Sequence, residues 1–312
     1  MTGPPYDILY TWVDDSFPGF LEERARYATN PEDLNPERTR DNLDLLKYSL
    51  RSVERYAPWR GKIWIVTCRP QVPRWLNSEH PNVGIVYLDE FMPADELPSF
   101  NAFAIESYVH RIPGLSERYV HFNDDMLLTR QVETTHFLSD SGRLQYYFNK
   151  SLPNVRKANM TPHASGRVNV ALALEKTFGP GRYPQQAHHP RIIDKGDMER
   201  LVDIYPEEFA RTRAARFRGH ETILPHILLA AHSVKEGRAD LNGPRQTRHV
   251  TGRVNLVNSA SLNRLRLTWA LARPSHFLCL NDDFGPRANP SVEETLRRFL
   301  CRISPDPSSY EH

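Results

Sequence analysis

The sequence predicts an α/β fold that is Rossmann-like, with a mostly parallel sheet flanked by helices and interrupted by helical and loop insertions. Short apolar runs typical of buried strands lie at residues 6–13, 62–68, 83–88 and 118–123. Segments with apolar residues at helical spacing lie between several of these runs. Such alternation of strands and helices indicates a largely parallel sheet covered by helices.

The composition is that of a globular protein large enough to bury a substantial core. Of its 312 residues, 39% are hydrophobic and 25% are charged. The net charge of +2 argues against nucleic acid as the main partner. No apolar run approaches the roughly 20 residues needed to span a bilayer, so we expect no membrane span.

The terminal segments and the cysteines carry further expectations. The amino terminus lacks the basic start and the apolar stretch of a signal peptide. Three cysteines without metal-binding spacing indicate reduced thiols, and therefore a cytoplasmic protein. Residues 304–312 are rich in Ser, Pro and Asp, and we expect them to form a flexible tail.

In the first half of the chain, helices are predicted between the strands. A proline-punctuated loop leads up to Arg40, and residues 41–57 form an amphipathic helix that Pro58 ends. Ser99 or Asn101 caps a helix that carries Ile105, Val109 and Ile112 inward.

In the second half, helices are expected at 197–209, interrupted by Pro206, at 221–234 and at 264–271. Residues 276–280 form a short strand, and Ser291 with Glu294 makes a capping box for the last helix. Residues 142–183 permit no prediction. The arginine-rich stretch 237–253 is either a solvated loop or a clamp for a phosphate or an acceptor.

The same polar sequence, Asn-Asp-Asp, follows two predicted strands, at residues 123–125 and 281–283. Neighbouring carboxylates repel each other, and a divalent cation relieves that repulsion. Carboxylate oxygens suit Mg²⁺ or Mn²⁺, which often reach a protein through one or two carboxylates and a substrate phosphate. In open α/β sheets, ligands bind beyond the carboxyl ends of the strands. The alternative is that these residues only solvate strand ends and start turns.

Phosphoryl chemistry also requires groups that offset phosphate charge and accept a proton. Arginine can grip phosphate with two donors, and histidine titrates near neutral pH, although each of these residues could instead be structural or merely exposed. Glu106 and His110 are four residues apart and share one helical face, which could also be a surface pair. Candidates for the phosphate contact are Arg40, Arg51 and Arg218, and candidates for the proton acceptor are His188 and His189. The carboxylates near the first strand, which could add to the acidic cluster, are Asp7, Asp14 and Asp15.

Four blocks of the sequence carry a family resemblance. The first runs from Asp7 to Asp14, and the second from Arg40-Asp41-Asn42 to Asn123-Asp124-Asp125-Met126. The third includes His188-His189-Pro190 and Arg218, and the fourth is Cys279-Leu280-Asn281-Asp282. These blocks resemble the Stealth family, the sugar-1-phosphate transferases of bacterial capsule synthesis. The animal N-acetylglucosamine-1-phosphotransferase has a similar catalytic core.

The resemblance implies one Stealth-type catalytic domain over residues 1–303, with core blocks at 6–15, 40–130, 184–234 and 276–302. It implies roles for individual residues. The implied catalytic residues are His188, Arg218, Glu106, Asp7 and Asp125. The residues expected to bind the nucleotide sugar are Thr11, Trp12, Asp14, Arg40, Asn42, Arg51, Asn101 and Asn123. The expected metal ligands are Asp124, Asp125 and Asp282, holding Mg²⁺ or Mn²⁺.

The hypothesis that follows is transfer of a hexose- or N-acetylhexosamine-1-phosphate from a UDP-sugar to a hydroxyl of a saccharide or polyol-phosphate acceptor. The products are a phosphodiester and UMP, in capsule or exopolysaccharide synthesis at the inner membrane face, with peripheral attachment to a polysaccharide assembly complex. One alternative is a metal-dependent glycosyltransferase that releases UDP. Another is a glycan-binding module that uses the acidic cluster to hold calcium.

Overall fold

The computed structural model describes residues 6–34, 40–41, 43–284 and 289–312. Its largest sheet has five strands in the order β3-β2-β1-β4-β8. The first four are mutually parallel and β8 pairs antiparallel with β4 at the edge. The strands are β1 (Tyr6–Thr11), β2 (Arg60–Thr67), β3 (Val83–Tyr87), β4 (Arg118–Asn123) and β8 (Arg191–Asp194). The predicted α/β class with a mostly parallel sheet is confirmed.

Two small sheets extend this arrangement. One has the order β10-β11-β5, with β10 and β11 parallel and β5 antiparallel to β11. The other has the order β7-β6-β9. Their strands are β5 (Met126–Leu128), β6 (Leu144–Ser151), β7 (Pro184–Gln186), β9 (Ala239–Asn242), β10 (Thr251–Val257) and β11 (Phe277–Asp283). A turn of two residues, Asp124 and Asp125, joins β4 of the main sheet to β5.

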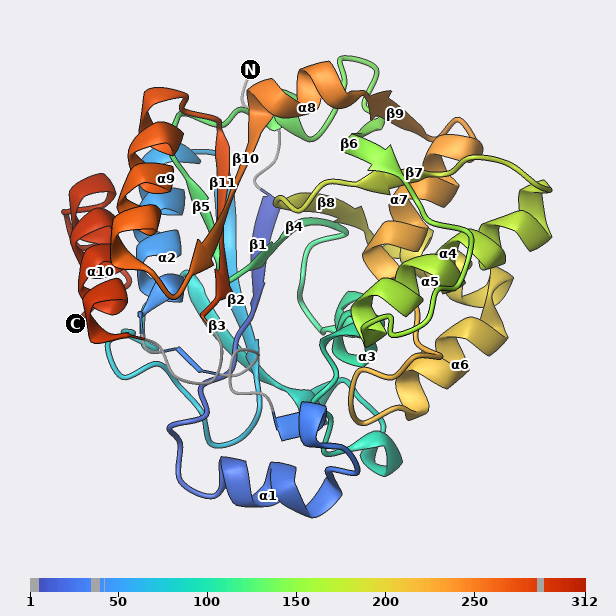
Figure 1. Cartoon of the computed structure of the whole chain (residues 1–312), viewed down its shortest axis with the longest axis horizontal. Coiled ribbons are helices and arrows are strands. Elements are labelled where there is room, and N and C mark those ends of the chain that lie inside the picture. Colours follow the sequence, from blue (N-terminus) through green and yellow to red (C-terminus); the bar gives the residue numbers. More distant parts are fainter. Residues whose placement is uncertain (1–5, 35–39, 42, 285–288) are drawn as a thin grey trace.

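Helices cover the strands on two sides (Figure 1), with α2, α9 and α10 on one side and α3 to α7 on the other. Within the described ranges, no helix combines the length and apolar character needed to cross a bilayer. The helices are α1 (Phe20–Tyr27), α2 (Leu45–Tyr56), α3 (Ala102–Glu106), α4 (Pro162–Phe178), α5 (Lys195–Ile204), α6 (Pro206–Ala214), α7 (Pro225–Lys235), α8 (Pro244–Val250), α9 (Ala260–Ala272) and α10 (Pro290–Ile303).

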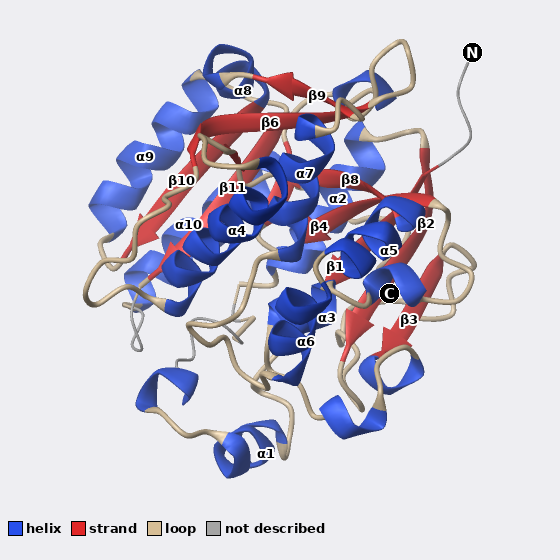
Figure 2. Ribbon diagram, turned by 90° about the vertical axis from the view of Figure 1, so that its right-hand side faces the viewer, coloured by secondary structure: helices blue, strands red, loops and turns tan. Residues whose placement is uncertain are grey.

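Strand β1 lies at the centre of the core because both of its faces are buried. Ile8 and Tyr10 pack in the cluster that includes the apolar face of α2, whereas Leu9 packs in the cluster that includes α7. A third cluster joins β11 and β10 to α9 and α10. Helix α1 lies beyond the end of the sheet toward which β2 and β3 point (Figure 2).

Several predicted elements differ in extent. Helix α3 is short, capped by the Asn101 side chain, and a separate helical turn follows at Val109–Arg111. The predicted helix over 197–209 is two helices that break before Pro206, because proline lacks the backbone donor a continuous helix needs. Asn289, rather than Ser291, caps the last helix.

Of the two alternatives for residues 237–253, the solvated loop is wrong, and the clamp for a phosphate or an acceptor stays a prediction. This stretch forms β9, α8 and the start of β10. β9 adds in parallel to β6, and the buried Thr247 hydroxyl of α8 donates to the Phe148 carbonyl at 2.9 Å. Pairing with β6, which could not be predicted from its sequence, therefore orders a segment whose local composition resembles a loop.

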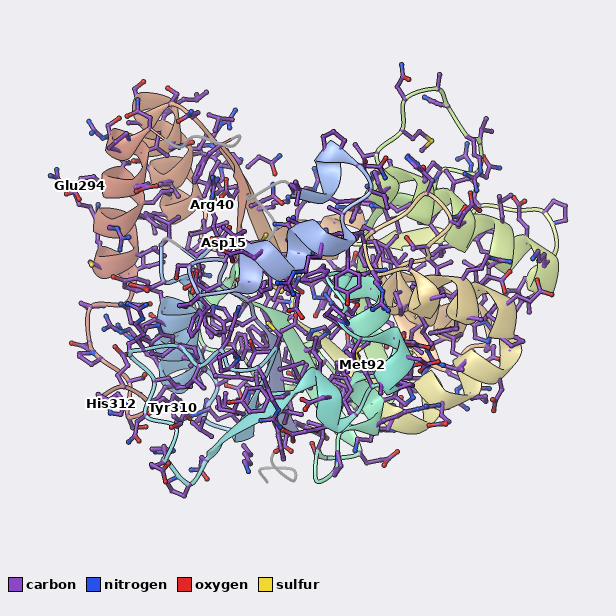
Figure 3. The ribbon with its side chains drawn as sticks, turned by 90° about the horizontal axis from the view of Figure 1, so that it is seen from below. Asp15, Arg40, Met92, Glu294, Tyr310 and His312 are labelled. Atoms are coloured by element: carbon purple, nitrogen blue, oxygen red, sulfur yellow. The ribbon has the colours of Figure 1, made fainter. Side chains whose placement is uncertain are left out.

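The prediction of a flexible tail is also wrong, since residues 304–312 pack against the body of the molecule. The Tyr310 side chain is 2% exposed, and its hydroxyl accepts from Arg60 Nε at 2.7 Å. Glu311 accepts from Arg51 Nε and Nη2, both at 2.7 Å, and from the Ser308 amide. The His312 amide donates to the Trp75 carbonyl at 3.1 Å, and Figure 3 shows the end of the chain beside the ribbon. These long-range contacts outweigh the local composition.

The Arg51–Glu311 pair predicts that the end of the chain contributes to stability. Replacing Glu311 with Ala should lower the free energy of unfolding by about 1–3 kcal/mol, because it leaves a largely buried guanidinium without its carboxylate. Urea unfolding followed by circular dichroism measures the change. The control is Glu294→Ala, which removes the exposed Arg298–Glu294 pair and should change stability by less than about 0.5 kcal/mol. Equal effects of the two substitutions would contradict the structural role of Glu311.

Candidate active site

A pocket of about 470 Å³ lies at the carboxyl ends of the four parallel strands of the main sheet. The segments that follow these four strands line the pocket, because the carboxyl ends of parallel strands lie at the same edge of the sheet. Helix α1 and the segment before α3 close the remaining sides. The lining includes Thr11, Trp12, Phe20, Val66, Thr67, Arg69, Asp89, Ser99, Phe100, Ile105, Asn123, Asp124 and Arg218.

The turn between β4 and β5 places two carboxylates next to this pocket. Asp124 lines the pocket, and Asp125 lies toward β11. The backbone amide of Leu280 donates to the Asp125 carbonyl at 2.9 Å, so β11 fixes the turn. The Cys279 thiol donates to Asp125 Oδ2 at 3.1 Å, which buries the thiol against the carboxylate.

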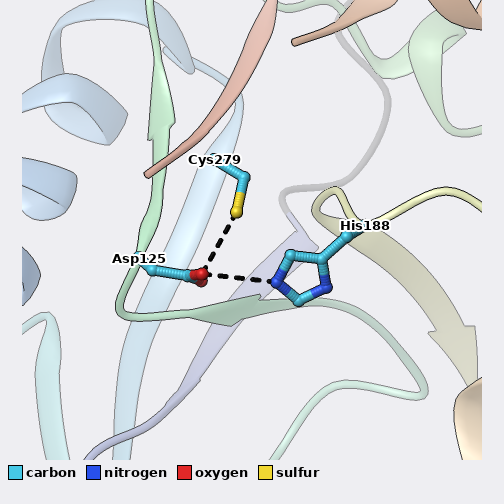
Figure 4. A group of neighbouring side chains, drawn as sticks. All are labelled: Asp125, His188 and Cys279. Atoms are coloured by element: carbon cyan, nitrogen blue, oxygen red, sulfur yellow. Dashed lines mark hydrogen bonds and ion pairs between the residues drawn. The ribbon is translucent and has the colours of Figure 1, made fainter. Parts of the chain in front are cut away.

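His188 reaches the same carboxylate from the segment between β7 and β8 (Figure 4). Its Nε2 lies 3.4 Å from Asp125 Oδ2. The next residue, His189, is 2% exposed and stacks on Phe277 with 5.7 Å between ring centroids. His189 is therefore an anchor in the core, and it holds His188 at the cluster.

The two neighbouring carboxylates have opposite electrostatic environments. Burial, together with the nearby Asp125 and Asp41 carboxylates, raises the pKa of Asp124 well above its usual value. Burial also acts to raise the pKa of Asp125. The His188 ring and the hydrogen bonds from His188 and Cys279 outweigh burial, so that the pKa of Asp125 is lowered. Asp125 is thus held ionised beside a carboxyl group that resists ionisation.

A buried arginine connects Glu106 to the same end of β4. Arg191 Nη2 lies 3.4 Å from Glu106 Oε1 and 3.4 Å from Asn123 Oδ1. Glu106 Oε2 also lies 2.7 Å from His226 Nδ1. The Glu106 side chain is about 5% exposed, so that its charge is matched by Arg191 in the interior. The predicted pairing of Glu106 with His110 does not form, because α3 ends at Glu106.

Two arginines predicted to meet phosphate lie at this end of the sheet. The Arg218 guanidinium lines the pocket and lies over the Phe103 ring, 4.7 Å from its centroid. Arg40 Nη2 pairs with Asp282 Oδ2 at 2.8 Å. Cys279 and Asp282 lie three residues apart on β11, so strand alternation places them on opposite faces. A metal-binding role for Asp282 stays a prediction, since its carboxylate accepts from the Phe284 amide at 2.9 Å and pairs with Arg40.

Other predicted site residues have structural contacts. Asp7 lies at the amino end of β1, away from the pocket, and accepts from the Lys62 amide at 2.9 Å and from Trp64 Nε1 at 2.9 Å. Asn101 is fully buried and donates to the Thr212 and Ala215 carbonyls. These contacts occupy both side chains, and the catalytic role expected of Asp7 and the binding role expected of Asn101 stay predictions. Both side chains satisfy buried backbone groups, a need that the linear sequence does not reveal.

Three further expectations have different outcomes. The Arg51 guanidinium is paired with Glu311 at 2.7 Å, and its contact with phosphate stays a prediction. The Asp14 carboxylate accepts from the Ser16 amide and hydroxyl at 3.0 and 2.8 Å, and therefore stabilises the turn after β1. Asn42 lies outside the described residues.

Sequence reasoning missed several residues of this region. Asp41 accepts from Trp12 Nε1 at 2.7 Å, and burial raises its pKa to about 6. Arg191, His226 and the Cys279 thiol were not assigned roles. Cys279 could have been noticed, because it lies two residues before the second Asn-Asp-Asp sequence. Nothing in the sequence around Arg191 distinguishes it from a surface arginine.

The donor set at the β4–β5 turn fits a hard divalent ion. Asp125 Oδ1 is buried and has no hydrogen-bond partner among the described residues. A buried carboxylate oxygen without a partner is costly, and a cation satisfies it. The same cation would relieve the repulsion between Asp124 and Asp125. Asp124 and Asp125 would hold such an ion together with substrate phosphate, as Mg²⁺ requires.

Comparisons with known sequences agree with this arrangement. Residues 38–146 match conserved region 2 of the Stealth proteins, residues 187–225 match conserved region 3, and residues 270–312 match conserved region 4. The matched ranges include the β4–β5 turn, His188 with Arg218, and the end of β11. The chain belongs to the Stealth family.

Curated relatives match nearly the whole chain. An exopolysaccharide phosphotransferase of Streptomyces coelicolor is 34% identical over 98% of this chain and 51% of its own length. One from Nocardia farcinica is 34% identical over 98% of this chain and 60% of its own length. CpsY of Mycobacterium tuberculosis, also an exopolysaccharide phosphotransferase, is 33% identical over 98% and 58%. The chain thus spans about half the length of the curated relatives it matches.

Among solved structures, the chain is similar to the galactosyltransferase LgtC in complex with donor and acceptor sugar analogs. The two share 12% sequence identity with a TM-score of 0.46, over 97% of this chain and 96% of that one.

Three largely buried histidines predict that the stability of the protein is sensitive to acid. Burial lowers the pKa of His110 and His189 to about 3 and that of His226 to about 4, from 6.5 in the unfolded chain. At a pH between the folded-state and unfolded-state pKa values, the unfolded chain binds more protons than the folded protein. The contribution of these histidines to stability is therefore fully present above pH 6.5 and is lost as the pH falls below it. The loss is at most about 1.4 kcal/mol per pH unit for each imidazole. Urea unfolding at about pH 7, 6 and 5 measures it.

A matched variant isolates one imidazole. His110 lies against α5 and away from the pocket, so His110→Leu should make the loss of stability with falling pH less steep by about one imidazole's share. Parallel loss of stability in the two proteins would show that His110 takes up no proton on unfolding.

Proposed function

We propose that the chain is the catalytic part of an enzyme that transfers a sugar-1-phosphate from a UDP-sugar to an acceptor hydroxyl during exopolysaccharide or capsule synthesis. Membership of the Stealth family and the names of the relatives support phosphotransfer in exopolysaccharide synthesis. The donor and the product are inferred from the chemistry of the pocket.

The observation that carries the proposal is that one pocket holds both a carboxylate and a guanidinium, Asp124 and Arg218, at the carboxyl edge of a parallel sheet. A nucleotide sugar needs surface for a base, polar groups for sugars and compensation for a diphosphate. Trp12 and Phe100 offer apolar surface in the same pocket, and Thr11 and Asn123 offer polar groups. A guanidinium beside the pocket would stabilise charge on the transferring phosphoryl group.

The Asp125–His188 pair supports a role in proton transfer. When His188 Nε2–H donates to Asp125, the Nδ1 lone pair is left to accept a proton from the acceptor hydroxyl. Asp125 would fix the orientation of the ring and stabilise the imidazolium that forms. Glu106 acts through Arg191, which it holds beside Asn123, and is therefore a positioning residue in this proposal.

The acceptor oxygen attacks the phosphorus that carries the sugar, the bond from that phosphorus to the bridging oxygen breaks, and UMP leaves. The acceptor proton passes to His188. A Mg²⁺ or Mn²⁺ ion held by Asp124 and Asp125 would supply charge neutralisation at the diphosphate. Arg40, paired with Asp282 near this edge, is a candidate for the nucleotide phosphate, and Asp282 for a further metal ligand.

The identity of the released nucleotide tests the proposal. Incubation with a panel of UDP-sugars, Mg²⁺ and a saccharide acceptor should release UMP, with phosphorus retained in the product. Chromatography of the nucleotides and ³¹P nuclear magnetic resonance of the product measure both. Release of UDP with a phosphorus-free product would establish the alternative, a glycosyltransferase that breaks the sugar–oxygen bond.

Replacing Asp125 with Asn should lower kcat by at least about 100-fold, because it removes the charge that orients His188 and a ligand for the ion. Initial rates of nucleotide release at saturating donor measure the effect, and circular dichroism verifies the fold. Asp203→Asn, on the exposed face of α5, is the matched control and should retain full activity. Near-normal turnover of a folded Asp125→Asn protein would exclude the assigned role.

A further inference from the structure

Asp125, His188 and Cys279 bring three different ligand types to one point. They come from the β4–β5 turn, the β7–β8 segment and β11, respectively (Figure 4). One oxygen, one nitrogen and one sulfur atom of these side chains all lie within 4.8 Å of one another. The Asp125 carboxylate is at their centre, 3.4 Å from His188 Nε2 and 3.1 Å from Cys279 Sγ.

These distances are close to the edges of a small coordination tetrahedron. Bonds of about 2.0–2.3 Å from zinc to oxygen, nitrogen and sulfur give ligand–ligand distances of roughly 3.3–3.8 Å. The two distances from Asp125 are near this range, and the distance between His188 and Cys279 is at most 4.8 Å, so movements of up to about 1 Å would let the three side chains surround an ion. Asp125 Oδ1 remains buried without a hydrogen-bond partner among the described residues, so the carboxylate retains capacity for a cation.

The ligand types select the ion. Mg²⁺ takes oxygen ligands and gains little from an imidazole and a thiolate. Zinc accepts carboxylate, imidazole and thiolate ligands. Zinc sites with three protein ligands keep a fourth position open to water or substrate. Asp124 and Asp125 together suit a hard ion such as Mg²⁺. Asp125 together with His188 and Cys279 favours a softer ion instead.

We propose that Asp125, His188 and Cys279 form a zinc-binding site. On binding, the thiol proton leaves to solvent and the hydrogen bond from Cys279 to Asp125 is replaced by two bonds to the metal. Because the ion takes both Asp125 and His188, zinc at this site inhibits turnover. This inhibitory consequence rests on the proposed function, whereas the binding of zinc does not.

Cobalt substitution tests binding without reference to activity. Metal-free protein titrated with Co²⁺ should develop thiolate-to-cobalt charge-transfer and tetrahedral visible bands that saturate at one equivalent, and Zn²⁺ should abolish them. Cys279→Ser should lose the charge-transfer band and weaken zinc binding by about 100-fold or more, since even outer partners of such sites contribute about 10–100-fold. Cys301→Ser, which changes an exposed thiol, should behave as wild type.

Two outcomes overturn the site: no charge-transfer band in wild type, or the same band in Cys279→Ser. If Cys279→Ser does not fold, His188→Ala serves in its place and should lose the tetrahedral visible bands. Inhibition is tested separately. Zinc is added to the Mg²⁺-dependent transfer assay of the wild-type protein and of Cys279→Ser. Cobalt binding without zinc inhibition would retain the site and reject its regulatory consequence. Absence of all transfer activity with normal cobalt spectra would reject only the proposed function.

Discussion

The arrangement of this protein depends on one hydrogen bond between distant segments, from the Leu280 amide to the Asp125 carbonyl. It joins β11 to the turn in which two carboxylates follow one another, and it links the small sheet to the main sheet through β4 and β5. Two adjacent, partly buried carboxylates repel each other. The turn keeps them in place because the Leu280 amide holds its backbone, while His188 and Cys279 contact the Asp125 side chain.

The groups around this turn give Asp124 and Asp125 different electrostatic environments. Asp125 is stabilised as an anion by an imidazole and a thiol, whereas Asp124 faces the pocket with two other carboxylates nearby. Behind them, Arg191 balances Glu106 in the interior and reaches Asn123 at the end of β4. The carboxylates form an acidic floor for the pocket, and the buried Arg191, which is paired with Glu106, lies behind it. Such a floor attracts a cation and the phosphates that accompany it.

The relation between sequence and site differs from residue to residue. Asp125 and His188 could be proposed from the residue types and from the family resemblance, and the structure brings them together. Asp7, Asn101 and Arg51 were proposed on the same grounds, but their side chains contact backbone groups or the end of the chain. A carboxylate that binds substrate and one that accepts from buried amides are indistinguishable in a linear sequence. The distinction depends on which strand end the residue occupies and on which segments pack beside it.

The sequence by itself determined the class of fold, because apolar periodicity and proline positions act over a few residues. It also determined that Asn-Asp-Asp ends a strand of the parallel sheet. Only the tertiary structure decided that β6 orders residues 237–253 and that Tyr310 and Glu311 fix the last residues to the core. It likewise decided that Cys279, rather than Asp282, faces Asp125, since strand alternation and the pairing of β11 with β5 set that register. Contacts between residues about a hundred or more positions apart have no local pattern, and the free energy of packing selects them.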